Sequence, residues 1–127
     1  MTFIIDTNVA IDLVNNEPGI AERIAALPRR VILSVVTQVE LAAGLLRAKA
    51  DLNLRARIES MLATFSIADF TPASAAAYET IIQVTGFLRP RVLDRMIAAQ
   101  ALVSDATLIT QNGKDFSDIP GLTLEIW

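Results

Sequence analysis

The chain of 127 residues contains neither cysteine nor histidine. The lack of cysteine excludes a disulfide framework, an iron–sulfur cluster and a thiolate zinc site. The lack of histidine removes the commonest general base and the commonest ligand of transition metals. A bound metal must therefore be held by oxygen atoms, which favours Mg²⁺ or Mn²⁺.

Long apolar runs and a basic excess are also missing. No uninterrupted apolar stretch approaches the roughly 20 residues of a membrane span, and Asp6 and Asp12 interrupt the N-terminal apolar segment. Neither a membrane anchor nor a signal peptide is predicted, so we expect a soluble, cytoplasmic protein. The net charge is −3, from 11 basic and 14 acidic residues, whereas a nucleic-acid-binding protein usually has a basic balance. If four acidic residues bind a cation, however, the acidic residues left over no longer outnumber the basic ones.

Short apolar runs alternate with segments of helical periodicity, and the length fits one domain, residues 1–127. Strands are predicted at Phe3–Ile5, Val31–Leu33, Ser66–Ala68, Thr107–Ile109 and Leu122–Ile126. Helices are predicted at Val9–Val14 (capped by Thr7 or Asn8), Ile20–Leu27, Thr37–Ala48, from after Asp51 to about Phe65, from Pro72 to about Phe87, and at Leu93–Val103, with Arg89–Arg91 as a loop. This alternation indicates an α/β fold with a mostly parallel sheet.

Four acidic residues occupy related places in this pattern. Asp6 directly follows the first predicted strand, and Asp115 follows the fourth. Glu40 lies in the helix after the second strand, and Asp94 lies at the start of a later helix. Because ligands bind outside the carboxyl ends of parallel strands, we expect all four side chains to open on the same edge of the sheet.

Each acid also has a local explanation. Asp6 can cap the first helix, Asp94 can cap the helix that follows it, and Asp115 can cap a short turn. Thr37–Glu40 matches a capping box, in which Glu40 bonds back to the Thr37 amide. The apolar neighbours of Glu40 nevertheless indicate that this side chain points into the protein or into a cleft.

The set of four acids favours a cation. Two carboxylates ~5 Å apart repel by roughly 3 kcal/mol at an effective dielectric constant near 20. Four in one place would exceed what a small domain can tolerate, so they must take up protons or bind a divalent ion. A hard cation with open water positions lowers the pKa of bound water and stabilises charge on a phosphoryl oxygen, without any histidine.

The chain resembles the PIN domains, and most of all the small VapC-type toxins of type II toxin–antitoxin systems. Four stretches carry the resemblance, in the family's order: "IIDTNVAIDL", "SVVTQVELAAGL", "LDRMIAAQAL" and "TLITQNGKDFSDIPGLTLEIW". The resemblance implies an α/β/α sandwich and an endoribonuclease that depends on Mg²⁺ or Mn²⁺ and cleaves tRNA or other structured RNA. The segment between Asp51 and Arg91 has no diagnostic motif.

The resemblance also assigns roles to single residues. The family's four acids, as catalytic residues and metal ligands, fall on Asp6, Glu40, Asp94 and Asp115. Its supporting polar positions fall on Thr7, Asn8, Thr110 and Asn112. A cognate antitoxin protein is implied as inhibitor. We expect it to cover an apolar groove beside the site and to place an Arg or Lys among the carboxylates, since a guanidinium can bond two carboxylate oxygens at once.

Basic residues near the acids are candidates for RNA contact. They are Arg89, Arg91, Arg95 and Lys114, with Arg47, Lys49, Arg55 and Arg57 as a second cluster around the turn between two helices. The alternative for both groups is a solvated loop. Hydrophobic residues make up 53% of the chain, which exceeds the usual share of about 45–50% and predicts a homodimer that buries apolar helix faces such as Val39–Leu46.

Two other functions remain open from the sequence. A phospho-acceptor signalling domain is also α/β and binds Mg²⁺, and Asp69 with a later hydroxyl and lysine fits part of its pattern. That class needs two adjacent acids after the first strand, where this chain has only Asp6. A PIN fold kept only for binding is the other alternative, against which the complete set of four acids argues.

Overall fold

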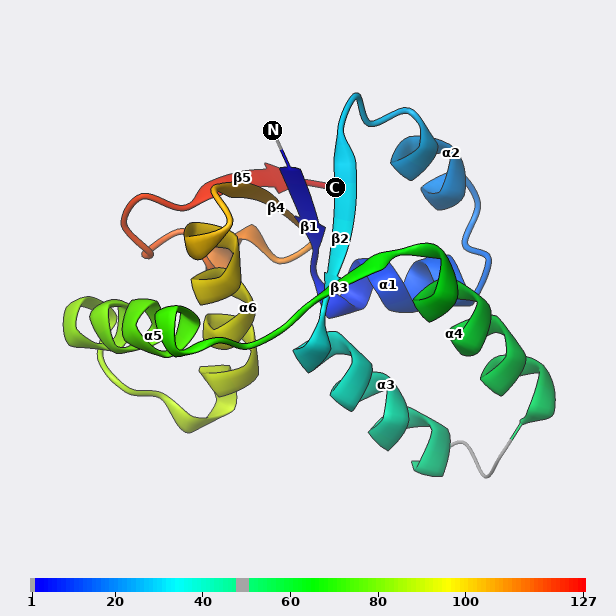
Figure 1. Cartoon of the computed structure of the whole chain (residues 1–127), viewed down its shortest axis with the longest axis horizontal. Helices are drawn as coiled ribbons and strands as arrows, with labels where there is room; N and C mark the ends of the chain where they lie inside the picture. Colours follow the sequence, from blue (N-terminus) through cyan, green and yellow to red (C-terminus); the bar gives the residue numbers. More distant parts are fainter. Residues whose placement is uncertain (1, 48–50) are drawn as a thin grey trace.

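The computed structural model describes residues 2–47 and 51–127, and its strands form one parallel sheet in the order β3-β2-β1-β4-β5 (Figure 1). The strands are β1 (Thr2–Ile5), β2 (Arg30–Ser34), β3 (Ser66–Ala68), β4 (Ala106–Thr110) and β5 (Thr123–Ile126). The helices are α1 (Thr7–Val14), α2 (Ile20–Ala25), α3 (Val35–Arg47), α4 (Leu52–Thr64), α5 (Pro72–Thr85) and α6 (Val92–Val103), with short 3₁₀ helices η1 (Arg89–Arg91) and η2 (Gly113–Asp115). The predicted α/β class and parallel sheet are confirmed.

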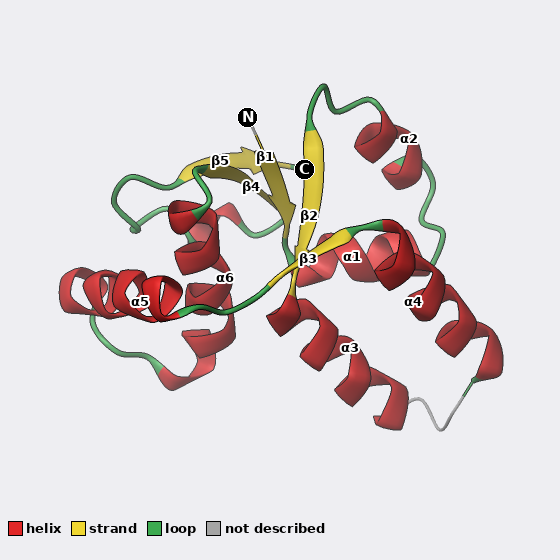
Figure 2. Ribbon diagram, viewed as in Figure 1, coloured by secondary structure: helices red, strands yellow, loops and turns green. Residues whose placement is uncertain are grey.

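Helices cover both faces of the sheet, because side chains of successive strand residues point to opposite sides. Phe3 and Ile5 of β1 pack into a core with residues of α1, α2 and α4. Ile4, which lies between them, packs into a second core with residues of α5 and α6. Figure 2 shows these two groups of helices on opposite sides of the strands. The result is the three-layer arrangement that the resemblance implies.

The central strands end together at one edge of the sheet. From β1 the chain builds outward through β2 to β3 and then crosses back, so that β4 pairs with the other side of β1. Ile5 is in register with Ile109, and the Asp6 amide donates to the Ile109 carbonyl at 2.8 Å. The reversal of strand order at β1 therefore places Asp6 beside Thr110, at the kind of position where open α/β sheets bind ligands.

Two helices begin two residues earlier than predicted. Helix α1 begins at Thr7 and not at Val9, because Asp6 is the N-cap residue and its Oδ1 accepts from the Thr7 amide at 2.8 Å. Helix α3 begins at Val35, where the Val36 amide donates to Ser34 Oγ at 2.9 Å. Thr37 therefore lies inside the helix, and the predicted capping box does not form.

The remaining boundaries differ by a few residues. Helix α5 begins at Pro72 as expected, with Thr71 as its cap, but it ends at Thr85 because Gly86 adopts φ 84°, a conformation that suits glycine. The predicted loop Arg89–Arg91 is a 3₁₀ helix. The expected end of the third helix, Ala48, lies outside the described residues. Within residues 2–47 and 51–127, no helix has the length and apolar character needed to cross a bilayer.

Candidate active site

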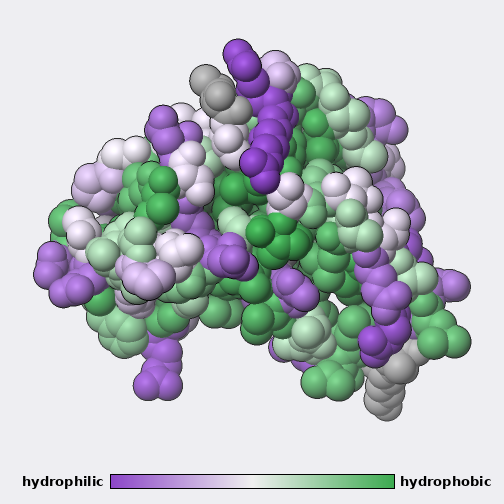
Figure 3. All heavy atoms as spheres, viewed as in Figure 1, coloured by the Kyte–Doolittle hydropathy of each residue, from purple (hydrophilic) through white to green (hydrophobic). Residues whose placement is uncertain are grey.

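The candidate site lies at the carboxyl edge of the sheet. Strands β1 and β2 run toward the lower edge of the view in Figure 1. The space-filling view is notched along this edge, between the side that carries α5 and α6 and the side that carries α3 (Figure 3). The elements that follow the central strands, α1 and α3, begin there.

Asp6 is buried, with 3% of its surface exposed. Its two oxygens have different partners, since Oδ1 accepts from the Thr7 amide at 2.8 Å and Oδ2 accepts from Thr110 Oγ1 at 2.9 Å. Burial raises the pKa of Asp6, and the hydrogen bonds from Thr110 and Thr7 oppose that rise. The capping role considered for Asp6 is real, yet it uses one oxygen and leaves the carboxylate at the edge of the sheet.

Glu40 is held by hydroxyl groups. Thr7 Oγ1 donates to Glu40 Oε1 at 2.7 Å and lies 2.9 Å from Thr37 Oγ1. Thr7 has one hydroxyl proton, and the carboxylate can only accept, so the proton of the second bond must come from Thr37. The chain of bonds therefore runs from Thr37 through Thr7 to Glu40, and it joins α3 to the first residue of α1.

Asp94 is half-buried in the first turn of α6. It does not cap the helix, which begins two residues earlier. Burial, followed by the negative charges of Asp6, Asp115 and Glu40, raises the pKa of Asp94 to about 6, while Arg91 opposes the rise. All three other acids thus act on Asp94 electrostatically, although they are distant from it in sequence.

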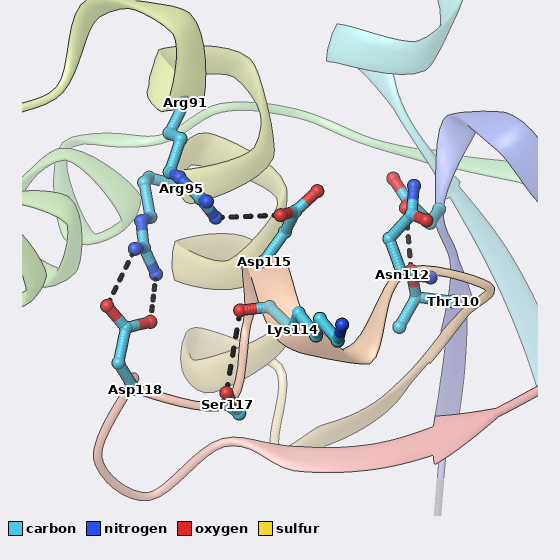
Figure 4. Close-up of polar contacts among 9 residues, drawn as sticks. Arg91, Arg95, Thr110, Asn112, Lys114, Asp115, Ser117 and Asp118 are labelled. Carbon is cyan, nitrogen blue, oxygen red and sulfur yellow. Dashed lines mark hydrogen bonds and ion pairs between the residues drawn. The ribbon is translucent and has the colours of Figure 1, made fainter.

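Asp115 is the last residue of η2, and its Oδ1 accepts from Arg91 Nη1 at 2.9 Å (Figure 4). Both side chains are about one-third exposed. The turn-capping role considered as an alternative for Asp115 is replaced by this ion pair. Arg91 therefore supplies one positive charge among the four carboxylates.

The position of Arg95 conflicts with the prediction that this residue contacts RNA phosphates. Its guanidinium donates to both oxygens of Asp118, at 2.8 and 2.9 Å, and Arg95 is only 4% exposed (Figure 4). The Arg95 bond lowers the pKa of Asp118. Arg95 therefore anchors the segment after η2 to α6 and is not available to RNA.

The other predicted residues lie at the same edge with different exposure. Thr110 is buried, and besides its bond to Asp6 it accepts from the Asn112 amide at 3.0 Å. The side chains of Asn8, Asn112 and Lys114 are exposed. In Figure 4, Asn112 and Asp115 point to the same side of the turn that joins them.

The second basic cluster is less uniform than the sequence indicates. Arg57 donates through Nε to the Val14 carbonyl at 2.8 Å and is half-buried. Arg47 and Arg55 are exposed. Lys49 lies outside the described residues.

The donor set suits a hard divalent cation in kind. The four acids offer carboxylates, and the neighbouring uncharged polar groups are hydroxyls and amides. Burial is the main cause of the raised pKa of Asp94, and the remaining part comes from repulsion that a cation would relieve. Among the described residues, however, no three acids are gathered closely enough to form a finished cage. Asp6, Glu40 and Asp115 each use an oxygen in bonds to Thr110, Thr7 and Arg91. The acids converge, but part of their binding capacity is occupied by neighbouring side chains.

Two parts of the site were not found from the sequence. Thr37 has a sequence signal, because it lies three residues before Glu40 and shares a helix face with it. The Arg91–Asp115 pair joins residues 24 positions apart, and no local pattern announces it. A further hydrogen-bond network joins α6 to the ends of β2 and β3. Gln100 of α6 is buried, accepts from Ser34 Oγ, and donates to the Ala68 carbonyl at 3.0 Å.

Known proteins resemble this chain over its whole length. The family model described as "PIN domain" matches residues 3–122. Ribonuclease VapC2 of Rickettsia felis is 27% identical over 133 residues, covering 100% of this chain and 98% of that protein. The tRNA(fMet)-specific endonuclease VapC of Salmonella typhimurium is 27% identical over 137 residues, with the same coverage. The crystal structure of VapBC2 from Rickettsia felis, bound to a DNA fragment from its promoter, contains a chain with a TM-score of 0.89 and 26% identity, covering 100% of this chain and 99% of that one.

Proposed function

The chain belongs to the PIN-domain family, and from that membership we propose that residues 1–127 form one domain that acts as the endoribonuclease toxin of a type II toxin–antitoxin system. The ribonuclease and tRNA endonuclease names of its relatives support an RNA substrate. The proposed substrates are tRNA or other structured RNA in the cytoplasm.

One observation in this chain carries the proposal. Asp94 has a pKa of about 6 partly because Asp6, Asp115 and Glu40 act on it. Those residues follow or belong to different elements, namely β1, η2 and α3. A purely structural role for four carboxylates is unfavourable, because their mutual repulsion raises the free energy of the folded state. Four carboxylates at the edge where parallel sheets bind ligands are expected for a site that uses negative charge.

Mg²⁺ or Mn²⁺ is the proposed cofactor, with Asp6, Glu40, Asp94 and Asp115 as its candidate ligands. Such an ion would supply charge stabilisation at a phosphoryl oxygen and a bound water of lowered pKa. Neighbouring residues of the chain orient two of these carboxylates through hydrogen bonds. Thr110 and the Thr7 amide hold Asp6, and the Thr7 hydroxyl holds Glu40, so each acid keeps a defined direction.

Basic residues beside the acids are proposed to position RNA phosphates. Arg91 and Lys114 flank Asp115 in sequence or in space, and Arg89 is exposed on η1. Phosphate contacts of this kind set register and orientation and not sequence choice. Arg95 is left out because Asp118 holds its guanidinium.

We also propose a cognate antitoxin protein. Solved VapBC complexes are among the structures that resemble this chain. A hollow of about 220 Å³ lies between α1, α3 and α4, beside Glu40. Half of its lining residues are aliphatic, namely Ile11, Val14, Leu41, Leu45, Leu54 and Ile58, and most of the others are polar or charged. The Arg91–Asp115 pair illustrates that a guanidinium fits these carboxylates, so an inserted basic residue of the partner is a reasonable inhibitor.

A homodimer through α3 is proposed for the same chain. Val39 is 61% exposed and Leu46 is 84% exposed, both on α3. Large exposed aliphatic side chains on one helix favour burial against a second copy. Sedimentation at micromolar concentration tests this, and a monomer would contradict it.

The signalling-domain alternative is disfavoured. Asp69 is exposed and follows the edge strand β3, two strands away from β1 and Asp6. A phospho-acceptor function would need Asp69 beside the acid site. The binding-only alternative differs from the proposal only in activity and is decided by experiment.

The decisive experiment compares cleavage of structured RNA by the parent and by Asp6→Asn, with and without Mg²⁺ or Mn²⁺. We expect cleavage only by the parent and only with metal. Asp105→Asn is the matched control: it makes the same charge change at the start of β4, at the opposite edge of the sheet, and its φ of 49° suits asparagine. Equal cleavage by Asp6→Asn at saturating metal would remove Asp6 from the ligand set, and a parent without activity would favour the binding-only alternative.

A further inference from the structure

A second hollow lies beside Asp115. It has a volume of about 670 Å³ and lies between the η2 turn and β5, with Asp115 in its wall. Its other principal lining residues are Gln111, Asn112, Lys114, Leu124 and Ile126. The hollow beside Glu40 lies between three helices, whereas this one lies between a turn and the edge strand β5; both combine aliphatic side chains with amide and basic groups.

The floor of this hollow is formed by the edge strand β5, which exposes a large aliphatic side chain there. Ile126 is 61% exposed although it lies directly beside the acid site. Gly113 makes this placement possible. A Cβ atom added to Gly113 would lie 2.3 Å from Ile126 Cδ1, so any side chain there would push Ile126 aside. Because Gly113 has no side chain, Ile126 can lie against the turn and stay exposed beside Asp115.

The rim of the hollow has complementary polar chemistry. Asn112 is exposed, and a primary amide offers both a donor and an acceptor. Its backbone is held by the bond to Thr110 Oγ1, which fixes where the side chain starts. Lys114 is exposed and brings a positive charge to the same turn. Figure 4 shows Lys114 and Asn112 arising from the same turn as Asp115.

We propose that this hollow is the subsite for the nucleotide next to the scissile phosphate of a single-stranded RNA segment, and that it sets the base preference of cleavage. Ile126 lies under the face of the base, Asn112 meets its hydrogen-bonding edge, and Lys114 meets the neighbouring phosphate. An unstacked base presents these three features, and proteins read single-stranded RNA through them. The inference rests on the proposed ribonuclease function.

Two substitutions change the floor in different ways. Ile126→Thr keeps the β-branched shape that suits a strand but removes aliphatic surface. Gly113→Ala adds the methyl group that displaces the end of Ile126. Val103→Thr is the control, because Val103 is also an exposed β-branched residue and lies at the end of α6, outside this hollow. None of these positions is among the proposed metal ligands, so titration with Mn²⁺ should give the parent's affinity in all three.

The assay is cleavage of an RNA library with a randomised single-stranded loop, read by sequencing of the new ends. The parent should show a base preference at a position adjacent to the cut. Ile126→Thr and Gly113→Ala should reduce that preference by about tenfold, the scale of one base contact, and leave preferences at other positions unchanged. Val103→Thr should match the parent.

Several results would overturn the inference. Parental base preferences at every position in both floor variants would do so while leaving the ribonuclease function intact. Unchanged preference with weakened inhibition by the antitoxin would assign the hollow to the protein partner instead. A parent that cleaves no member of the library in any divalent metal would overturn the proposed function, and the subsite with it.

Discussion

The charge of Asp94 should destabilise the metal-free protein, and Asp94→Asn should therefore stabilise it. Burial and the three neighbouring acids raise the pKa of Asp94 from 3.8 to about 6. A shift of one unit corresponds to about 1.4 kcal/mol, so the shift sets an upper limit of about 3 kcal/mol on the destabilisation. Asp94 is only half-buried, and solvent screening reduces the expected gain to about 1–2 kcal/mol.

The pH dependence fixes the sign. Between about pH 4 and pH 6 the folded protein binds a proton at Asp94 that the unfolded chain does not, so this residue makes stability fall as pH rises through that window. The advantage of Asp94→Asn is therefore complete above pH 6, shrinks as pH falls, and disappears below about pH 4. For a chain of this length, 1–2 kcal/mol corresponds to a rise in Tm of about 4–7 °C.

The assay is thermal unfolding followed by circular dichroism between pH 4 and pH 7.5, in EDTA. Asp105→Asn controls for the change in net charge and should stay within about 0.5 kcal/mol of the parent. Added Mg²⁺ should raise the Tm of the parent more than that of Asp94→Asn, since only the parent retains all four carboxylates. A lower Tm of Asp94→Asn at pH 7, or a difference that is the same at pH 4 and pH 7, would refute the raised pKa of Asp94 and with it the destabilising effect of burial and neighbouring charges.

Three other substitutions test the contacts around the acids. Asp118→Ala leaves the buried Arg95 without its partner and should lower the free energy of unfolding by about 1–3 kcal/mol in urea titrations at pH 7. Because Arg95 lowers the pKa of Asp118, this loss of stability relative to the parent should shrink once the pH falls below about 4. Arg91→Gln removes the cation that competes with a metal for Asp115. Calorimetric titration should therefore show that Mn²⁺ binds more tightly, by roughly threefold or more, on the scale of an exposed ion pair. Weaker Mn²⁺ binding would show that Arg91 assists the metal. Thr37→Val removes the donor to Thr7 and should cost about 1 kcal/mol of stability and reduce the cleavage rate, while Thr37→Ser should restore both; equal behaviour of the valine and serine variants would exclude the hydroxyl chain.

The sequence predicted the architecture because local patterns specify it. Alternating short apolar strands and amphipathic helices leave a parallel sheet as the favoured way to bury both faces of each strand. Parallel strands of similar length end at a common edge, so the position of Asp6 directly after one strand and of Asp115 in the segment after another was enough to predict neighbouring carboxylates. The stretches that resemble PIN domains added the residue roles.

The local sequence was misleading where two good local structures competed. Thr37-Gln38-Val39-Glu40 matches a capping box, but Ser34 lies at the end of β2 and caps α3 first. The helix start was therefore decided by where the strand leaves the sheet. Thr37 then became a buried hydroxyl inside the helix, and its partner came from α1.

What the sequence by itself determined is the α/β fold and the kind of chemistry, because oxygen ligands are all that a chain without cysteine and histidine can offer a metal. Only the tertiary structure decided how the nearby charges are used. Arg91 and Arg95 lie on neighbouring turns and look alike in sequence, yet one joins Asp115 in the acid site and the other is buried against Asp118. Each pairing spans more than twenty residues and depends on which face of α6 meets the chain after β4. Such long-range choices are made by packing, which acts between segments that the sequence keeps apart.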